Sequence, residues 1–408
     1  MKKIYSLLFL SLFFTAYGGG FQVNLLGQRQ IGMGHIGVAL RGSASSIAFN
    51  PGSLSFMNHT FDSQVGFNLV KTNVAFQYQQ PSDYTASSEN PWGTPFSVYG
   101  AYKLNEKAAF GIGVYTPFGS SVSWEDDWRG RFLIQNISLR AIFVQPTFSY
   151  KLTDNIGLGA GLVIANGSVN LQRALPFEDQ NGNEGMVELD GNTTALGFNA
   201  GLYIKISEKI NVGIDYRSKV TMNLEDGDAN FSVPASLSAS FPSNNKFDAE
   251  LPLASTLTAG LRFQVCDNFM MGLEGSYVGW DAYDSLIFDF KENTDVLEDS
   301  RNPREYKDAF IIRLGGEYTI DSTVAVRAGI YFDQAPSNED FLTPETVDVN
   351  RFGLSAGASF SPNDQLDIDL SFLYILGIER EASYTPANFS GTYRVNGFVP
   401  GIGIRYHF

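Results

Sequence analysis

Side chains for metal binding and redox chemistry are scarce in this chain. Its 408 residues include one cysteine, Cys266, and three histidines. A single cysteine excludes an internal disulfide and a cysteine-rich metal site. Lys and Arg number 28 against 43 Asp and Glu, which gives a net charge of -15. Because phosphate backbones are bound by clustered cations, this balance argues against a nucleic-acid partner.

Long apolar runs are also missing after the first residues. The N-terminus, MKKIYSLLFLSLFFTAYGGGF, has two lysines, a short apolar core and small residues at Ala16 and Gly18. This order predicts a secretory signal peptide over residues 1–18, with the mature chain starting near Gly19. No later stretch holds 18 apolar residues, so we expect no transmembrane helix. The exported protein is then either soluble or a β-barrel.

Alternating apolar and polar residues are abundant. Segments such as NVGIDYRSKV, STVAVRAGIYFD and DQLDIDLSFLYI place apolar side chains on every second position. Period two predicts β-strands, and each segment is long enough to cross a bilayer. The chain ends in GIGIRYHF, whose Ile402, Ile404, Tyr406 and Phe408 form the same stripe. A closed barrel would pair this last strand with the first and expose the stripe to lipid.

Connection lengths support a barrel over a soluble β-sandwich. Short polar turns occur at 105–106, 153–155, 207–209, 267–268, 321–322 and 362–364, and longer polar loops lie between them. Outer-membrane barrels have tight periplasmic turns and larger external loops, whereas a sandwich predicts evenly spaced strands. With a first strand near 62–76 and a last near 394–408, the sequence predicts an all-β fold. It is a transmembrane antiparallel β-barrel of about 14 strands over residues 61–408.

Residues 19–60 differ from the rest of the chain. They are rich in Gly, Ala and Ser and do not alternate. A fourteen-stranded barrel encloses space that strand side chains alone would not fill. We therefore predict that this segment is an N-terminal plug, or hatch, in the lumen.

Two glycine motifs look like catalytic or phosphate-binding loops. GLSAG, at 353–357, matches a serine nucleophile elbow around Ser355, but it lies inside an alternating strand and no histidine is placed as its base. GLGAG, at 157–161, is also within a strand, where glycines facing the lumen would make room for the plug. The acidic loop 178–185 is out of register with a calcium loop. We expect no enzyme, no cofactor and no metal site.

Two further features leave alternatives open. Pro117 has no N–H for a strand ladder, and Gly119 follows it, so the wall there has a kink or gap, or the strand simply ends. Several cations fall on the face opposite the apolar stripes: Arg173, Arg217, Lys219, Arg262, Arg313 and Arg327. Most should pair with lumen acids such as Asp215, Glu274 and Glu317. One or two left unpaired in a partly dry interior would hold a carboxylate strongly.

Seven stretches, taken in order, support a resemblance to a known family. They are GGFQVNLLGQRQIGMGHIGVAL, FNPGSL, YTPFGSSVSWEDDWRGRF, YKLTDNIGLGAGL, VGIDYRSKV, YKDAFIIRLGGEY and AGIYFDQAPS. Together they resemble the FadL-like family of outer-membrane transporters for long-chain fatty acids and other hydrophobic compounds, over essentially the whole mature chain. The resemblance implies a fourteen-stranded barrel with a hatch. It also implies passive transport through an external apolar groove, a lumen pocket and a lateral exit at a strand kink.

The resemblance also assigns roles to residues. Asn50, Pro51 and Gly52 are similar to an Asn-Pro-Ala hatch motif, with Gly52 departing from the usual Ala. Pro117, Phe118 and Gly119 resemble the kink of the third strand, which favours the gap. Arg173, in VNLQRAL, and Lys307, in YKDAF, match basic residues that bind a ligand carboxylate.

Long-chain fatty acids are the expected cargo, and aromatic hydrocarbons or other lipids also fit. A general porin is the alternative among channels, and a barrel enzyme or a structural or adhesive barrel are rivals of other classes. We expect a monomer in the outer membrane of a Gram-negative bacterium, with a hydrophobic ligand and outer-membrane lipid as partners. The barrel-assembly machinery should recognise the terminal Phe408.

Overall fold

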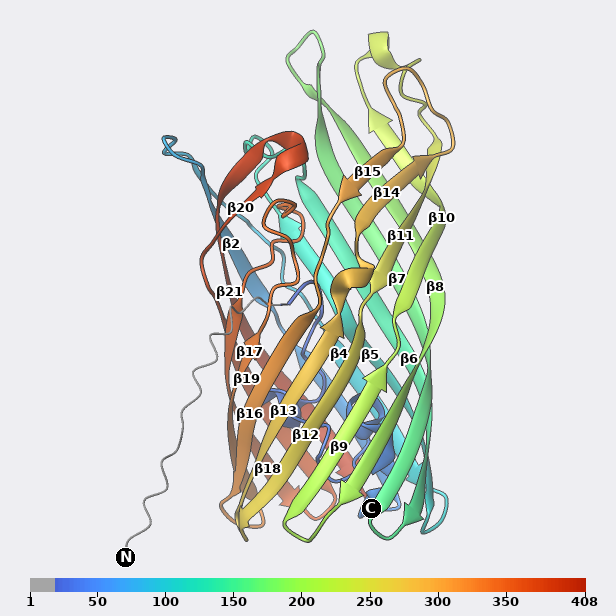
Figure 1. Ribbon diagram of the computed structural model, residues 1–408, viewed down its shortest axis with the longest axis vertical. Helices are drawn as coiled ribbons and strands as arrows, with labels where there is room; N and C mark the ends of the chain where they lie inside the picture. The colour runs from blue at the N-terminus through green and yellow to red at the C-terminus, as the bar shows by residue number, and fades with distance from the viewer. Residues whose placement is uncertain (1–18) are drawn as a thin grey trace, which may run out of the picture.

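The wall of the molecule is a single antiparallel β-sheet that closes on itself. The computed structural model describes residues 19–408 (Figure 1), so the predicted signal peptide lies outside the described residues. The sheet has 21 strands. They are β1 (Phe61–Asn68), β2 (Lys71–Tyr78), β3 (Thr85–Ser87), β4 (Phe96–Lys103), β5 (Ala108–Ser123), β6 (Asn136–Thr153), β7 (Ile156–Glu178), β8 (Glu184–Lys205), β9 (Ile210–Arg217), β10 (Val220–Ser232), β11 (Asn245–Leu253), β12 (Ser255–Cys266), β13 (Phe269–Gly279), β14 (Ser285–Phe290), β15 (Ser300–Pro303), β16 (Ala309–Thr319), β17 (Val324–Asp333), β18 (Arg351–Asn363), β19 (Leu366–Gly377), β20 (Arg380–Tyr384) and β21 (Phe389–His407).

Short interruptions divide some transmembrane strands into two of these segments, as between β1 and β2 or between β9 and β10. Counted as transmembrane strands, they form a closed 14-strand antiparallel barrel, which confirms the prediction. The ladder between β1 and β21 runs from Asp62 opposite His407 to Asn68 opposite Gly401. Phe408 continues it, since its N–H donates to the Phe61 carbonyl at 3.1 Å. The last strand therefore pairs with the first along its whole lower length.

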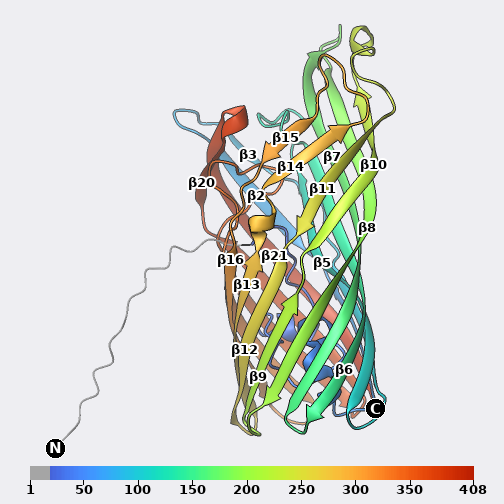
Figure 2. The same cartoon turned by 45° about the vertical axis from the view of Figure 1, so that its right-hand side comes forward.

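A band of exposed apolar side chains surrounds the barrel. Ile402, Ile404, Tyr406 and Phe408 are 42–54% exposed although they are apolar, as expected for a lipid-facing stripe. Aromatic side chains mark the edge of the band toward the long loops: Tyr277, Phe310, Phe352, Tyr374 and Phe398. Apolar bands bordered by aromatic residues are typical of outer-membrane barrels, whose long loops lie outside the cell. On that external side β7, β8, β10 and β11 rise above the rest of the wall, together with β14 and β15 (Figure 2).

The few helices are short. They are α1 (Gln28–Ile31), α2 (Ser46–Phe49), η1 (Pro51–Phe56), η2 (Ala235–Leu237), η3 (Trp280–Ala282) and η4 (Thr385–Ala387). Within residues 19–408 no helix is long and apolar enough to cross a membrane. The first three belong to the segment before β1, which lies inside the lower half of the barrel (Figure 1).

Glycines on the inner face of the wall let the backbone of this inner segment approach closely. A Cβ on Gly213 would lie 1.9 Å from the Val38 carbonyl oxygen, and one on Gly315 would lie 2.0 Å from that of Met33. Gly157 of the GLGAG motif would meet Gly52 in the same way, at 2.3 Å. Real Cβ atoms do not approach this near, so these positions require glycine.

Charged side chains fix the inner segment to the wall. Glu274 accepts hydrogen bonds from the backbone N–H groups of Gly37 and Val38, both at 2.6 Å. Arg29 forms two bonds to Glu317, at 2.6 and 2.8 Å, and Glu317 also accepts from Arg327 at 2.6 Å. Because buried charges are costly unless they are paired, each of these contacts holds the segment in one position.

The remaining lumen cations have different surroundings. Arg217 donates to the Ala48 carbonyl at 2.8 Å, Arg313 donates to Ser276 at 2.6 Å, and Arg262 bonds Gln264. Lys219 was expected to face the lumen and instead is exposed on the outside. The break between β9 and β10 falls next to it, so the alternation that was counted along NVGIDYRSKV does not continue through this residue.

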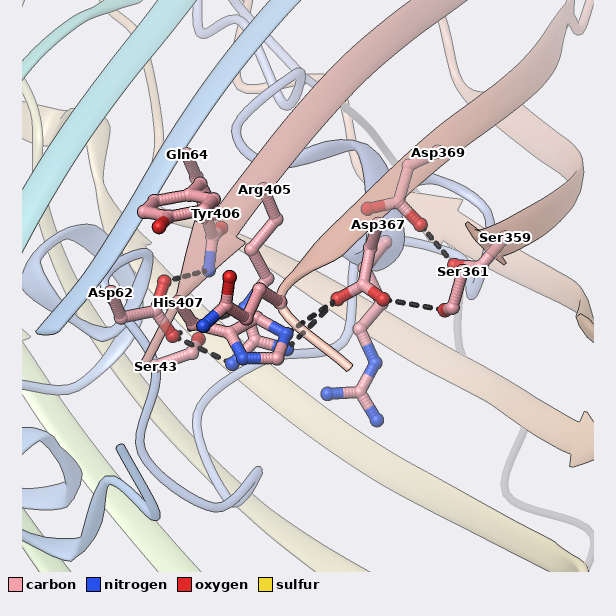
Figure 3. Close-up of polar contacts among 12 residues, drawn as sticks. Ser43, Asp62, Gln64, Ser359, Ser361, Asp367, Asp369, Arg405, Tyr406 and His407 are labelled. Carbon is pink, nitrogen blue, oxygen red and sulfur yellow. Dashed lines mark hydrogen bonds and ion pairs between the residues drawn. The ribbon is translucent and has the colours of Figure 1, made fainter. Parts of the chain in front are cut away.

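A polar cavity of about 220 Å³ lies at the end of the lumen near the short turns. There Arg405 links Asp62 of β1, at 2.6 Å, to Asp367 of β19, at 3.5 Å (Figure 3). His407 lies 3.2 Å from Asp367, and Ser361 donates to Asp367 at 2.5 Å. These charged pairs thus link β1, β21 and β19 where the barrel closes. They also make this end of the lumen hydrophilic.

The tight glycine contacts predict the effect of one substitution. Gly213→Val should prevent Val38 from seating and should open a path through the lumen, because the added side chain overlaps a backbone oxygen. Overpacking of this kind typically costs about 1–3 kcal/mol. In planar bilayers we expect larger single-channel conductance than for the wild type. Gly275→Val is the matched control, since its Cβ would meet nothing within 4 Å; equal conductance of both variants and the wild type would contradict the prediction.

Candidate functional site

The wall has an opening beside the upper half of β5. Phe96 at the end of β4 exchanges two hydrogen bonds with the Thr116 hydroxyl, at 3.0 and 3.2 Å. Higher up, Glu89 N–H donates to the Ser123 carbonyl at 2.8 Å. Between these points, residues 118–122 pair with β6, and in the described part of the chain no strand lies beside residues 117–122 on the β4 side. We call this stretch of the wall the window.

The local sequence explains why the ladder fails here. Pro117 has no N–H to donate, and the register between β5 and β6 shifts between Tyr115 and Phe118. Across the opening, the chain between β3 and β4 runs through Pro91 and Pro95, which also cannot donate. The structure therefore places Pro117, Phe118 and Gly119 at an irregularity in the wall and not at the end of a strand.

The first described residues fill the window from inside. Val23 N–H donates to the Pro117 carbonyl at 2.8 Å, and Gly119 N–H donates to the Phe21 carbonyl at 3.0 Å. These two bonds form an isolated antiparallel bridge between Gln22 and Phe118. The leading segment, Gly19–Asn24, thus supplies the backbone partners that β4 does not.

Aromatic rings hold the leading segment in place. The Phe21 ring lies 4.7 Å from that of Trp280, 6.0 Å from Tyr283 and 6.1 Å from Phe118, measured between centroids. The first two contacts are edge-to-face, the geometry that aromatic pairs prefer. Only 4% of Phe21 is exposed, so its release would uncover a large apolar surface.

A carboxylate in the external loop between β17 and β18 also contacts the leading segment. Asp348 accepts a hydrogen bond from Gly20 N–H at 2.9 Å and another from Ser337 N–H at 3.2 Å. Burial raises the pKa of Asp348 to about 6, while Arg351 and these N–H donors act in the opposite direction. Gly20 has φ +57°, and a Cβ there would lie 2.5 Å from Trp280, so only glycine fits between the ring and the loop.

Directly inside the window is an apolar cavity, the lumen pocket, with a volume of about 80 Å³. Phe21, Phe118 and Gly119 form its side toward the window. The rest of its lining is mostly aliphatic and aromatic: Leu171, Leu189, Met222, Leu224, Phe247, Leu253 and Phe288. Such a lining suits an apolar ligand.

Two larger cavities adjoin the lumen pocket. The window cavity, of about 480 Å³, shares Phe21, Phe118, Gly119 and Leu139 with it. On the external side the outer groove, of about 310 Å³, shares Leu171, Leu189, Phe288 and Glu345 with it. The three cavities therefore follow one another from the external loops to the side wall, with the leading segment between the lumen pocket and the window.

Arg173 lies in the outer groove. Within residues 19–408 it makes no hydrogen bond or ion pair, although apolar side chains such as Leu175 and Phe177 surround it. Arg304 lines the same groove, pairs with Glu345 and leaves its Nε without a partner among the described residues. Lys307 is exposed, lines none of the three cavities and bonds the Pro336 carbonyl through its backbone N–H at 2.8 Å.

Sequence reasoning missed Arg304, three residues before Lys307 in NPREYKDAF. It lies in a loop between two strand segments, where alternation gives no indication of direction. The available signal is the cluster of basic residues in NPREYKDAF, but the sequence alone does not show which of these residues enters the groove.

Asn50, Pro51 and Gly52 lie lower in the barrel, away from the three cavities. The Asn50 amide donates to the Val38 carbonyl at 2.7 Å and to the Leu202 carbonyl at 3.0 Å, and its oxygen accepts from Gly52 N–H at 2.9 Å. A Cβ on Gly52 would lie 2.6 and 2.8 Å from two carbonyl oxygens of the wall. This close approach explains glycine where the resembled motif has alanine.

Ser355 has a structural environment. Its hydroxyl accepts from Gly34 N–H at 2.8 Å and donates to the Gly329 carbonyl at 3.3 Å. These are contacts between the inner segment and the wall, and they leave the hydroxyl no general base among the described residues.

The protein is a closed barrel with a lipid-facing surface. Its lumen holds its own N-terminal segment, and its apolar cavities lead to a side opening. These features define the class of outer-membrane transport proteins. The family model described as "Outer membrane protein transport protein (OMPP1/FadL/TodX)" matches residues 9–408, so the chain belongs to this family. It is an outer-membrane protein of Gram-negative bacteria. Membership of a transport family also supports a channel and not an enzyme.

Relatives and solved structures are similar to this protein over nearly the whole chain. The 47 kDa outer membrane protein of Pasteurella multocida is 24% identical and the alignment covers 97% of this chain and 95% of that one. The long-chain fatty acid transport protein of Salmonella typhi is 21% identical, with 92% and 91% covered. The crystal structure of a Pseudomonas aeruginosa FadL homologue has a TM-score of 0.83 at 18% identity, with 96% and 100% covered. The crystal structure of the Ralstonia pickettii toluene transporter TbuX has a TM-score of 0.72 at 18% identity, and the match covers 94% of this chain and 99% of that one. At this level of identity, both structures show the fold alone.

Proposed function

We propose that this protein passively transports hydrophobic molecules, with long-chain fatty acids as the main cargo. The cargo enters the outer groove, moves into the lumen pocket and leaves sideways through the window into the membrane. One observation carries the proposal: the window adjoins an apolar pocket, and among the described residues the leading segment is what closes it. The inner segment, including Asn50, Pro51 and Gly52, acts as a hatch that remains in the lumen.

The polarity of the lumen supports a lateral route. Moving an apolar molecule from apolar surroundings into water raises its free energy. Below the leading segment the lumen contains ion pairs such as Arg327 with Asp369, at 2.7 Å, and the polar cavity near the short turns. A path along the barrel axis would therefore be unfavourable for this cargo, whereas the outer groove, lumen pocket and window are lined mainly by apolar side chains. The same charged lower lumen, filled by the hatch, disfavours a general porin.

The groove cations favour a fatty acid over a neutral hydrocarbon. Among residues 19–408 Arg173 makes no hydrogen bond or ion pair, and a ligand carboxylate in this largely apolar groove would gain a charge-assisted hydrogen bond to it. Arg304 lies in the same groove and already pairs with Glu345, so we assign it a secondary role. Lys307, which is exposed, remains a prediction from the resemblance. Aromatic hydrocarbons stay compatible with the apolar lumen pocket, and one structural relative is named a toluene transporter.

We propose further that the protein acts as a monomer. The continuous ladder between β1 and β21 closes the barrel without a partner chain. Phe408 is 54% exposed at the end of this ladder, and we expect the barrel-assembly machinery to recognise it during insertion.

A charge in the window tests the route. Gly119→Glu should abolish uptake of a radiolabelled long-chain fatty acid into cells, because a carboxylate would occupy the apolar exit. Gly119→Ala should retain most uptake, since its Cβ would lie 3.2 Å from the Leu139 carbonyl oxygen and 3.8 Å from Cγ2 of Val23, so only a small shift is needed. Asn192→Glu, which places the same charge at an exposed position of β8 outside the three cavities, is the matched control. Normal uptake by a folded Gly119→Glu barrel would rule out the lateral exit.

The role of Arg173 is tested by comparing two ligands. Arg173→Gln should weaken binding of a long-chain fatty acid about 10- to 100-fold, since hydrogen bonds to charged groups contribute about 1.5–3 kcal/mol. Binding of an alkane with the same tail should change little. Isothermal titration of the purified barrel measures both, and Lys307→Gln is the control at an exposed cation. An equal loss for the two ligands would remove the proposed carboxylate contact.

A further inference from the structure

The outer surface around the window contains cations without acidic partners. Arg140 of β6 lies opposite Gly119 in the ladder and is exposed. Ile137 and Ala141 of the same strand are buried, so alternation directs the exposed Arg140 side chain to the outside. Arg140 also borders the lumen pocket and the window cavity, so it lies at the opening itself. Within residues 19–408 it makes no hydrogen bond or ion pair. One edge of the window therefore presents a free guanidinium to the membrane.

The opposite edge of the window also carries exposed cations. Lys71 of β2 is exposed, and its Nζ donates to the Asn90 carbonyl at 2.6 Å and lies 5.9 Å from the Trp92 ring centroid. Trp92 borders the window cavity and is 53% exposed. On the adjacent strand β21, Arg394 is exposed and, in the described part of the chain, forms no hydrogen bond or ion pair.

Two of these cations, Lys71 and Arg140, lie just above the apolar band, and Arg394 lies further toward the external side, opposite Ala75 of β2. Lys71 is opposite Phe398, one of the aromatic residues at the external edge of the band. Arg140 is opposite Ser168, while Val144, four residues nearer the short turns, is opposite Ile164. Both edges of the window thus have their positive charges where the outward surface changes from apolar to polar, which is the height of lipid headgroups. Exposed tryptophan is also favoured at this height.

We propose that Lys71, Arg140 and Arg394 form a binding surface for the phosphate groups of a phosphorylated lipid in the outer leaflet, located at the rim of the window. Its acyl chains would lie against the apolar band below. The cations occupy both edges of the opening on separate strands, and a headgroup with two phosphates can contact more than one of them. The single negative charge of a leaving fatty acid would neutralise only one of the three cations. This assignment does not depend on what the window transports.

The charge of the rest of the protein strengthens this assignment. The chain has a net charge of -15, and its external loops contain acidic stretches such as 295–299. Soluble anions are repelled by such loops, whereas a lipid already in the membrane approaches from the side. Each Lys or Arg near an anionic membrane surface contributes roughly a fivefold increase in affinity.

Trp92 provides a local probe of the rim. Of the four tryptophans, Trp124, Trp128 and Trp280 are at most 3% exposed, so a quencher in the lipid phase reports mainly on Trp92. The barrel would be placed in phosphatidylcholine nanodiscs and titrated with a bis-phosphorylated lipid A whose acyl chains are brominated. The same brominated lipid without phosphates is the parallel titration. Lys219→Gln is the matched control variant, since Lys219 is an exposed cation near Tyr216 of the apolar band, in the break between β9 and β10, which do not border the window.

We expect the phosphorylated lipid to reach half-maximal quenching at a mole fraction at least tenfold lower than the dephosphorylated lipid. The triple variant Lys71→Gln, Arg140→Gln and Arg394→Gln should abolish this difference, and Lys219→Gln should retain it. Circular dichroism verifies that each variant is folded. Equal quenching by the two lipids, or an equal effect of Lys219→Gln, would overturn the proposal. Competition by millimolar inorganic phosphate would indicate a site for free anions, and competition by a long-chain fatty acid would assign the rim to cargo; either result would also overturn it.

Discussion

Backbone hydrogen bonding in the bilayer is the constraint on which this structure depends. Lipid offers no partner to an N–H or C=O group, so a spanning β-sheet must close on itself. The chain meets this requirement at the seam by pairing β1 with β21 up to the last residue and by adding the Asp62–Arg405 ion pair on the inner side. It departs from the requirement at the window, where β5 has no strand beside residues 117–122. There the leading segment replaces the missing strand with two backbone hydrogen bonds, and a substitute held by so few bonds can be removed.

The interior is divided by polarity. In the lower lumen, glycines such as Gly213 let the backbone of the inner segment approach the wall, and buried ions such as Glu274 hold that segment in place. The upper lumen is apolar and hollow and connects the outer groove to the window. On the proposed route this contrast in polarity would direct the cargo without an energy source, because an apolar solute would find favourable surroundings toward the outer groove and sideways through the window. Asp348 and the ring of Trp280 hold the leading segment at the junction of these regions.

Period-two alternation and turn spacing were sufficient to predict the closed barrel and its strand number, because both follow from local sequence. The stripe ending at Phe408 also indicated that the last strand needed a partner on each side.

The same local reasoning left Pro117–Gly119 undecided between a kink and a strand end. The reason is that the backbone partner of β5 at this point comes from residues about 95 positions earlier, Phe21–Val23. It placed Lys219 in the lumen because it could not detect the break between β9 and β10. The family resemblance selected Lys307, and neither it nor the local pattern indicated Arg304, whose entry into the groove is set by loop conformation. Family resemblance contributed what local patterns could not, namely a reason to examine the window and Arg173.

The most direct test of the account is to lock the leading segment onto β5 and measure transport. Gln22 and Phe118 lie directly opposite each other in the bridge and the hydrogen bonds flank them, so their Cα atoms should be about 4.5 Å apart, within reach of a disulfide. Gln22→Cys and Phe118→Cys would be combined with Cys266→Ser, which removes the native cysteine. The account predicts that oxidised cells do not take up fatty acid and that reduction restores uptake to the level of the same variant never oxidised. Undiminished uptake by barrels shown to be fully cross-linked would contradict it.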